Sequence, residues 1–131
     1  MADFEFIIPR RPLSVQAKPR KLAAWKAFVR EVVTQSWNGR VMEGELRLTL
    51  VYLCKDPTPD IDNIIKPIQD ALKGLVMTDD SQVADVDSHR RFLDATFDLS
   101  RLPPLLLFGI AKQMECVYVR VGSGLLLEDL L

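Results

Sequence analysis

The chain has 131 residues, of which 48% are hydrophobic and 27% charged, and its formal net charge is −1. This length and composition predict one globular domain over residues 1–131 that buries roughly two-thirds of its unfolded surface. The sequence has no apolar run of membrane-spanning length, and its first twelve residues lack the basic segment and apolar run of a secretory signal. Two widely separated cysteines, Cys54 and Cys116, and a single histidine argue against a zinc site. We expect both thiols to be buried in a reducing compartment, the cytoplasm.

Charge is unevenly distributed along the chain. Residues 1–47 carry nine Lys or Arg against five Asp or Glu, residues 48–98 carry five against ten, and residues 99–131 carry three of each. A basic first third beside an acidic centre could be a phosphate-binding surface next to a metal site. Charge alone favours the simpler interpretation, a solvated helix face followed by a polar loop.

The first part of the chain predicts a strand, a helix and a second strand. Residues 4–8 read as a short strand. An apolar stripe at helical spacing predicts a helix over residues 18–37, with Trp25 in the core, and Asn38-Gly39 ends it. Residues 43–54 alternate between apolar and polar side chains, which predicts a strand.

The centre predicts a second helix, over about residues 63–73. Asp62 is its expected N-cap and Gly74 its expected C-terminal stop. Pro67 is a defect in this pattern. Because its ring nitrogen carries no hydrogen, it should leave the carbonyl of Asn63 free and can tilt the start of the helix.

The remaining segments predict two more strands, over residues 83–93 and 115–121. Between them, residues 101–109 contain a Pro-Pro turn and fit either a strand or a loop. The apolar tail, residues 122–131, could pack on its own domain, on a partner subunit or on nothing. The element order predicts an α/β or α+β fold, a small mixed β-sheet flanked by two helices in β-α-β-α-β-β order. The sequence does not decide whether the strands around the first helix are parallel.

Acidic side chains are concentrated between Asp60 and Asp80. Asp60 and Asp62 precede the second helix, where an extended chain places both carboxylates on one side, and they repel unless a cation or a proton lies between them. Mg²⁺ takes one or two carboxylates and keeps water or phosphate oxygens as its other ligands. Asp62, Lys66 and Asp70 are spaced by four and share one helix face, so the lysine can reach the same pocket.

Asp79 and Asp80 are expected to begin the next strand. If that strand lies beside the helix start, Asp80 closes the metal site from the other side. An EF-hand calcium loop is excluded, because Ile64 and Ile65 occupy the positions where it needs an acid or amide and a glycine.

Each of these charged residues also has a purely structural interpretation. Asp60 and Asp62 can be turn or cap residues. Lys66 and Asp70 can be a surface pair that contributes only about 0.2–0.5 kcal/mol, and residues 79–80 can form a polar turn. The residues taken alone leave the catalytic and the structural interpretations nearly even.

The segment PDIDNIIKPIQDALKGLVMTDDSQVADV contains the pattern Asp-x-Asp-Asn-x-x-Lys, then Asp-Ala-Leu, then Asp-Asp-x-Gln-Val. The matching positions are Asp60, Asp62, Asn63 and Lys66, then Asp70-Ala71-Leu72, then Asp79-Asp80-Ser81-Gln82-Val83. In residue type and spacing this segment resembles the signature of the RusA family of Holliday junction resolvases.

The resemblance implies a Mg²⁺-dependent endodeoxyribonuclease, with Mn²⁺ able to substitute, that acts as a homodimer on four-way DNA junctions in recombination and repair. It implies metal ligands at Asp60, Asp62 and Asp80 and a catalytic lysine at Lys66. The cation would activate water for in-line attack on a phosphodiester, and the lysine would stabilise the charged transition state. Supporting roles fall on Asn63, Asp70 and Asp79.

The N-terminal turn, PRRPLSVQAKPRK, departs from the family pattern because it is less typical than a Pro-Pro-Ser-Asn-type loop, which leaves open how the junction arms are held. The residues that could contact DNA phosphates are Arg10, Arg11, Lys18, Arg20, Lys21, Arg90 and Arg91. Solvated basic side chains explain the N-terminal group equally well, and His89 is expected to be an ordinary surface residue.

Two rival functions stay open. One is a metal-dependent nuclease or phosphoryl transferase without junction preference, and the other is a degenerate relative that binds DNA or protein without cutting. The intact residues Asp60, Asp62, Lys66 and Asp80 argue against degeneration.

Overall fold

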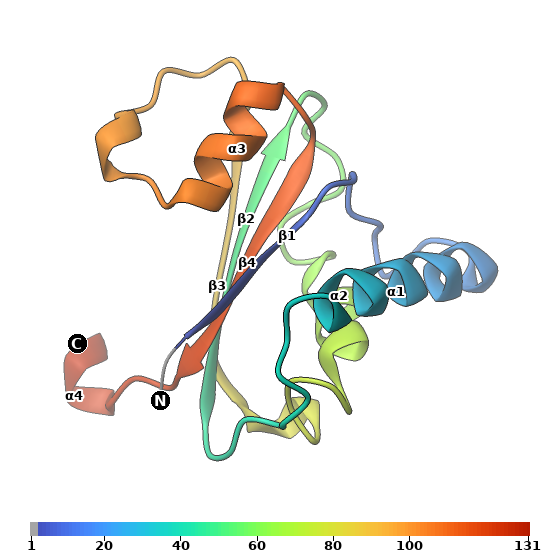
Figure 1. Ribbon diagram of the computed structural model, residues 1–131, viewed down its shortest axis with the longest axis vertical. Helices are drawn as coiled ribbons and strands as arrows, with labels where there is room; N and C mark the ends of the chain where they lie inside the picture. The colour runs from blue at the N-terminus through green and yellow to red at the C-terminus, as the bar shows by residue number, and fades with distance from the viewer. Residues whose placement is uncertain (1–2) are drawn as a thin grey trace.

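The structure is a computed structural model that describes residues 3–131 and contains a four-stranded sheet (Figure 1). Its strands are β1 (Phe4–Ile8), β2 (Leu46–Cys54), β3 (Val83–Phe92) and β4 (Cys116–Ser123). The spatial order is β1-β4-β2-β3, in which β4 is antiparallel to both its neighbours and β2 is parallel to β3. The predicted mixed sheet is therefore confirmed. β4 lies between β1 and β2, so the strands around the first helix do not pair.

One face of the sheet is covered by α1 (Pro19–Thr34) and α2 (Ile65–Leu72), as Figure 1 shows. Alternate residues of β2 and β4 point toward these helices and form a large hydrophobic cluster with their buried side chains. Trp25 of α1 is 5% exposed, which confirms the predicted core position. Pro19 is the first residue of α1, where a missing N–H costs no hydrogen bond.

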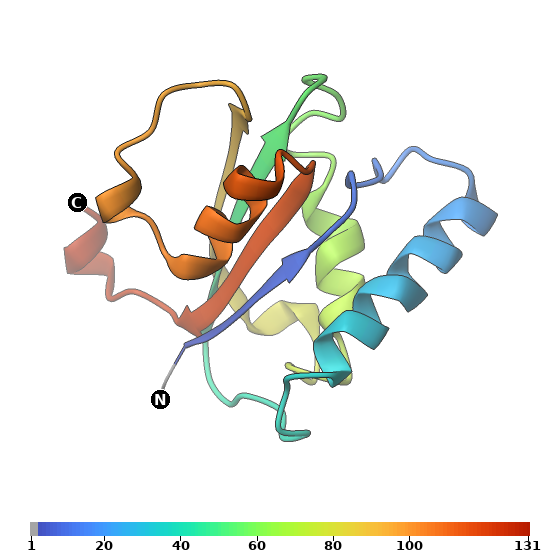
Figure 2. The same cartoon turned by 45° about the horizontal axis from the view of Figure 1, so that its top comes forward.

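The other face is covered at one end by α3 (Pro104–Lys112), which lies near the carboxyl end of β2 and the start of β4 (Figure 2). The sequence predicted a strand or loop here, and that prediction is wrong. Pro104 begins the helix at a position that proline favours, and the continuous apolar run that follows has no clear period to reveal a helix. α3 packs on a second, smaller hydrophobic cluster that includes Leu53 and Cys116, so this end of the sheet is buried on both faces. A short 3₁₀ turn, Leu99–Arg101, precedes it.

The start of α2 differs from the prediction. Its N-cap is Ile64, which makes no side-chain capping bond, so Asp62 is not the cap. The reason is Pro67, which fits only within the first turn of a helix, where N–H groups have no intrahelical partner. The carbonyl of Asn63 that Pro67 leaves free accepts the backbone N–H of Val15 (2.9 Å). The helix ends just before Gly74, whose φ of 83° agrees with the predicted stop.

Asp79 and Asp80 do not begin β3, contrary to the prediction. Asp79 caps a short 3₁₀ turn, Asp80–Gln82, and β3 starts at Val83. The physical reason is a capping box, in which the Asp79 carboxylate and the Gln82 side chain each satisfy backbone N–H groups of the turn.

The tail begins inside β4 and ends in α4 (Leu127–Leu130), which stands off the sheet in Figure 1. The backbone N–H of Leu125 donates to Oδ2 of Asp85 (2.7 Å), so the first part of the tail packs on its own domain. Leu126, Leu127 and Leu131 are each more than 60% exposed, so this last part does not. Both cysteines are free and buried, as predicted. In residues 3–131 no helix has the length and apolar character needed to cross a membrane.

Candidate active site

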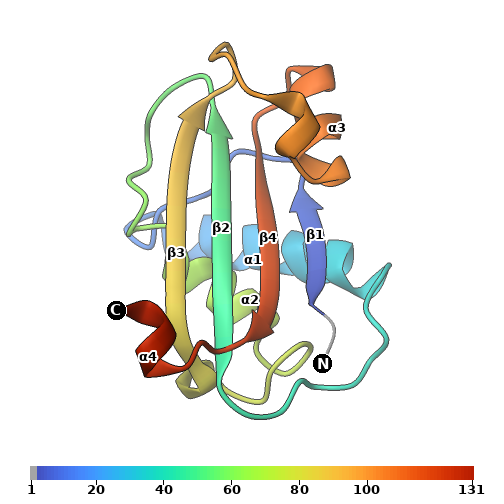
Figure 3. The same ribbon diagram turned by 90° about the vertical axis from the view of Figure 1, so that its left-hand side faces the viewer.

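The loop between β2 and α2, residues 55–64, carries the first two candidate acids. It leaves the carboxyl end of β2 and runs beside the edge strand β3 (Figure 3). Asp60 and Asp62 are both exposed, and the side chain of Asp60 is 73% exposed. The backbone N–H of Asn63 donates to the carbonyl of Asp60 (3.1 Å), so Asn63 closes the turn through its main chain.

Lys66 brings the start of α2 and the 3₁₀ turn together. Its ammonium group pairs with the carboxylate of Asp80 and lies 3.0 Å from Oδ1 of Asp70. The hydrogen bonds to Asp80 and then Asp70 raise the pKa of Lys66 above its usual value, so it stays positively charged. The structure therefore places Lys66, Asp70 and Asp80 in one charged group.

Asp70 is shared between two lysines from different helices. Nζ of Lys26 on α1 lies 3.1 Å from Oδ2 of Asp70, while Lys66 approaches the other oxygen. Burial alone would raise the pKa of Asp70, but the hydrogen bonds from Lys66 and Lys26 outweigh it and hold the pKa below its usual value. Asp70 thus orients Lys66 and ties α2 to α1.

Lys26 was not among the predicted site residues. One sequence feature could have identified it: Lys26 lies one turn before Arg30, on the side of the helix opposite the apolar stripe. Arg30 donates to the carbonyls of Ala71 and Lys73 (3.1 and 2.8 Å), which are free at the C-terminal end of α2. The basic side of α1 is therefore a docking surface for α2.

The turn that carries Asp80 is fixed by its neighbours. The carboxylate of Asp79 accepts hydrogen bonds from Ser81 and lies 3.1 Å from Nζ of Lys73, and these contacts lower its pKa to about 2. Nε2 of Gln82 donates to the carbonyls of Met42 (2.9 Å) and Gly44 (3.1 Å), which anchors the turn to the loop before β2. Gln82 was not among the predicted site residues, although a glutamine three residues after an aspartate is the usual pattern of a capping box.

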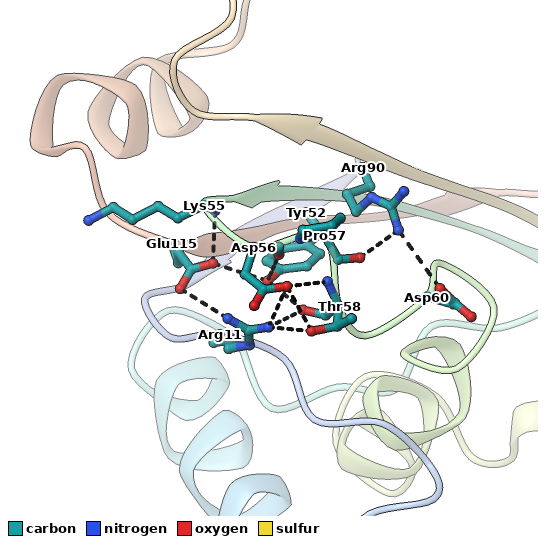
Figure 4. A network of polar contacts seen from close by, with 9 residues as sticks. All are labelled: Arg11, Tyr52, Lys55, Asp56, Pro57, Thr58, Asp60, Arg90 and Glu115. Carbon is teal, nitrogen blue, oxygen red and sulfur yellow. Dashed lines mark hydrogen bonds and ion pairs between the residues drawn. The ribbon is translucent and has the colours of Figure 1, made fainter.

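The edge strand β3 contacts the loop of residues 55–64, called the acidic loop below. Oγ of Ser88 donates to the carbonyl of Ile61 (2.7 Å), and Nη1 of Arg90 donates to the carbonyl of Pro57 (2.6 Å). Arg90 also lies 3.9 Å from Asp60 (Figure 4). Ser88 and Arg90 share one face because side chains alternate along a strand. Ser88 was missed by the sequence, and Arg90 contacts the loop rather than standing free as a phosphate contact.

The other basic candidates occupy different surroundings. The guanidinium of Arg10 lies 3.6 Å from the ring centre of Phe28, and Arg11 contacts the acidic loop. Arg91 and the exposed His89 line an apolar cleft of about 240 Å³ under α3, on the opposite face of the sheet. Three basic side chains are exposed at the start of α1, namely Lys18, Arg20 and Lys21.

Over residues 3–131, no group of three or more His, Cys, Asp or Glu side chains converges closely enough to bind a metal ion. The positive charge beside Asp80 is the ammonium of Lys66. The donors nevertheless fit a hard divalent cation in kind, because Asp60, Asp62 and Asp80 offer only carboxylate oxygens and Mg²⁺ needs one or two of them. The site of three acids stays a prediction.

The comparison with protein families gives one finding. The family model described as Endodeoxyribonuclease RusA matches residues 10–96. This match spans α1, β2, α2 and β3 together with the loop of Asp60 and Asp62 and the turn of Asp79 and Asp80, and it ends before α3 and β4. No curated protein matches the chain.

Proposed function

Because the chain belongs to the RusA family of endodeoxyribonucleases, we propose that it is a Mg²⁺-dependent nuclease that resolves four-way DNA junctions in recombination and repair. The observation that carries the proposal is the charged group of Lys66, Asp70 and Asp80 beside the loop of Asp60 and Asp62. Phosphodiester cleavage builds negative charge on the phosphate, and an oriented ammonium beside carboxylates suits that demand.

The chain's own residues would divide the work as follows. Asp60, Asp62 and Asp80 would hold the cation, which when bound supplies a Lewis acid and activates water. Lys66 would stabilise charge on the scissile phosphate. Asp70, which contacts Lys66 at 3.0 Å, would keep the ammonium oriented.

Binding of a junction would use the exposed basic residues at the start of α1 and a second copy of the chain. Lys18, Arg20 and Lys21 would neutralise phosphates on one arm. A homodimer suits a four-way junction, because its two-fold axis would place one active site at each of two opposed strands. We propose that the enzyme acts in the cytoplasm.

The decisive experiment compares a synthetic four-way junction with a linear duplex of the same sequence, in Mg²⁺, in Mn²⁺ and in excess chelator. We expect paired nicks in the junction only, and only with the metal present. Equal cutting of both substrates would instead indicate a nuclease without junction preference. Tight binding without cutting in either metal would indicate a degenerate relative.

The site assignment is tested by Asp62→Asn. Asp62 is exposed and does not cap α2, so this nearly isosteric change should leave folding intact. We expect the cutting rate to fall by more than about 100-fold while junction binding is unchanged. Loss of a residue that only contacts a metal ligand costs at most about 100-fold, so a larger loss indicates a ligand. Asp94→Asn, at another exposed acid, is the matched control and should cut normally. If Asp62→Asn still cuts, the assignment is wrong.

A further inference from the structure

Arg11 contacts the acidic loop through most of its guanidinium group (Figure 4). Nη2 donates to the carbonyl oxygen of Thr58 (2.5 Å) and to its hydroxyl oxygen (2.7 Å), and lies 3.5 Å from Asp56. Nη1 lies 3.6 Å from the carboxylate of Glu115. A guanidinium is a planar fork of donors, so groups on two sides of it fix its orientation as well as its position.

Behind Arg11, a half-buried carboxylate and a buried phenol complete the network. Oε2 of Glu115 accepts the backbone N–H of Lys55 (2.9 Å) and lies 3.2 Å from the hydroxyl of Tyr52. The same hydroxyl lies 3.1 Å from the carbonyl of Thr58. A carboxylate so placed needs a counter-charge, because removing one partner of a desolvated pair leaves the other uncompensated. Arg11 supplies that charge and joins Glu115 to the loop.

The loop is therefore held from two directions. Arg11 donates to the carbonyl of Thr58 from the sheet end, while Ser88 of the edge strand donates to the carbonyl of Ile61. In the sequence Asp60 lies between these two bound carbonyls, so both anchors restrain its backbone.

We infer that Arg11, backed by Glu115 and Tyr52, is a positioning residue for the loop that carries Asp60 and Asp62, and is not a phosphate contact. The inference rests on the proposed function for what the loop does, but the anchoring itself can be measured separately. Its consequence is that part of the active site depends on Glu115, which lies outside the segment matched by the family, residues 10–96.

The test separates positioning from DNA binding with two substitutions. Arg11→Lys keeps the charge but loses the fork, and Arg11→Met removes both. We expect both variants to lower kcat on a four-way junction by about tenfold or more, since a displacement of about 1 Å can cost about 100-fold. Junction affinity and its dependence on salt should stay as in the wild type, because no phosphate contact is lost.

A phosphate contact would give the opposite pattern. Arg11→Met would then weaken junction binding and reduce the slope of log K against log salt by about 0.9, whereas Arg11→Lys would behave as the wild type. That result would overturn the inference, as would wild-type kinetics in both variants. Arg101→Met, an exposed arginine before α3, is the control for loss of charge and should change neither kcat nor the salt slope.

Amide hydrogen exchange gives a readout that does not depend on cutting. In folded Arg11→Lys protein, confirmed by its thermal transition, the amides of residues 55, 56, 58 and 60–62 should exchange faster than in the wild type and in Arg101→Met. If the wild type cuts no DNA, the proposed function fails while exchange still tests the anchor. If exchange in Arg11→Lys is unchanged, the positioning role fails even for an active nuclease.

Discussion

The two faces of the sheet are covered in different ways. On the face of α1 and α2, a large hydrophobic cluster is supplemented by directional contacts, such as Lys26 to Asp70 and Arg30 to the C-terminal end of α2. On the face of α3, a smaller cluster around Leu53 lies next to the apolar cleft of about 240 Å³. All the candidate catalytic residues lie on the first side.

The difference lies in how the helices are held, because directional contacts fix α1 against α2, whereas on the α3 face the charged pair Arg47–Asp87 joins two strands. Apolar burial stabilises a helix against a sheet but is not directional, so it tolerates small shifts. Charge-assisted hydrogen bonds weaken quickly with distance and angle, and they fix one arrangement. A site that must orient Lys66 against a phosphate needs the second kind of contact, whereas α3 needs only to cover the sheet.

The largest effect is expected from replacing one buried leucine of β2 by alanine in each of the two hydrophobic clusters. Leu50 faces the large cluster and Leu53 the small one, and they are 0% and 2% exposed. Leu→Ala in a core costs about 2–5 kcal/mol, and the cost is larger where the surroundings cannot relax. We expect Leu50→Ala near the upper end and Leu53→Ala near the lower end in urea denaturation, because Leu53 lines the open cleft. Equal losses would remove the distinction between the faces.

A smaller effect is expected where α3 approaches the sheet most closely. A Cβ added at Gly109 would lie 2.7 Å from Sγ of Cys116. Ala is better than Gly in a helix by about 1 kcal/mol, but overpacking costs about 1–3 kcal/mol, so Gly109→Ala should destabilise the fold by up to about 2 kcal/mol. Adding Cys116→Ala should make the Gly109 change less costly in a double-mutant cycle. A Gly109→Ala protein more stable than wild type would mean that α3 is loosely placed.

The same contrast explains how far the sequence could predict the fold. Alternation along residues 46–54 and 116–121 revealed β2 and β4, because these strands point one side into the large cluster. α3 was missed because its apolar residues form an unbroken run that contains a glycine. Such a run shows neither the 3.6-residue period of a helix nor the two-residue period of a strand. A polar turn at residues 79–80 was considered, but its capping box was missed because Asp79 was not compared with the glutamine three residues later.

For the site, the motif identified the side chains but not what holds them. Lys26 and Asp70 are 44 residues apart, and Ser88 and Ile61 are 27 apart. No local pattern links such pairs, because only the packing of α1 on α2 and the parallel pairing of β2 with β3 bring them together. Arg11 shows the same limit, since composition identified a basic residue but not its partners.

The smallest effect is expected in the pH dependence of stability, and it should come from Glu115, which contacts the acidic loop. Burial alone would raise the pKa of Glu115, but hydrogen bonds from Lys55 and Tyr52 and the charge of Arg11 hold it below the usual value of 4.5. A carboxyl group with a lowered pKa stabilises the fold above pH 4.5, and this stabilisation is lost as the pH falls through its folded pKa.

Glu115→Gln should therefore reduce stability at pH 7 by about 0.5–1.5 kcal/mol, the usual net contribution of one hydrogen bond, because the amide keeps an acceptor oxygen. The gap from the wild type should narrow as the pH falls below 4.5 through the folded pKa of Glu115, because the side chain then loses the charge that Gln lacks. Urea denaturation at pH 7, 5 and 3 measures this, with Glu128→Gln on the exposed tail as a control that should show no gap at any pH. A gap that stays constant down to pH 3 would mean that Glu115 contributes through its shape, and the charge of Arg11 would then not be needed to hold the loop.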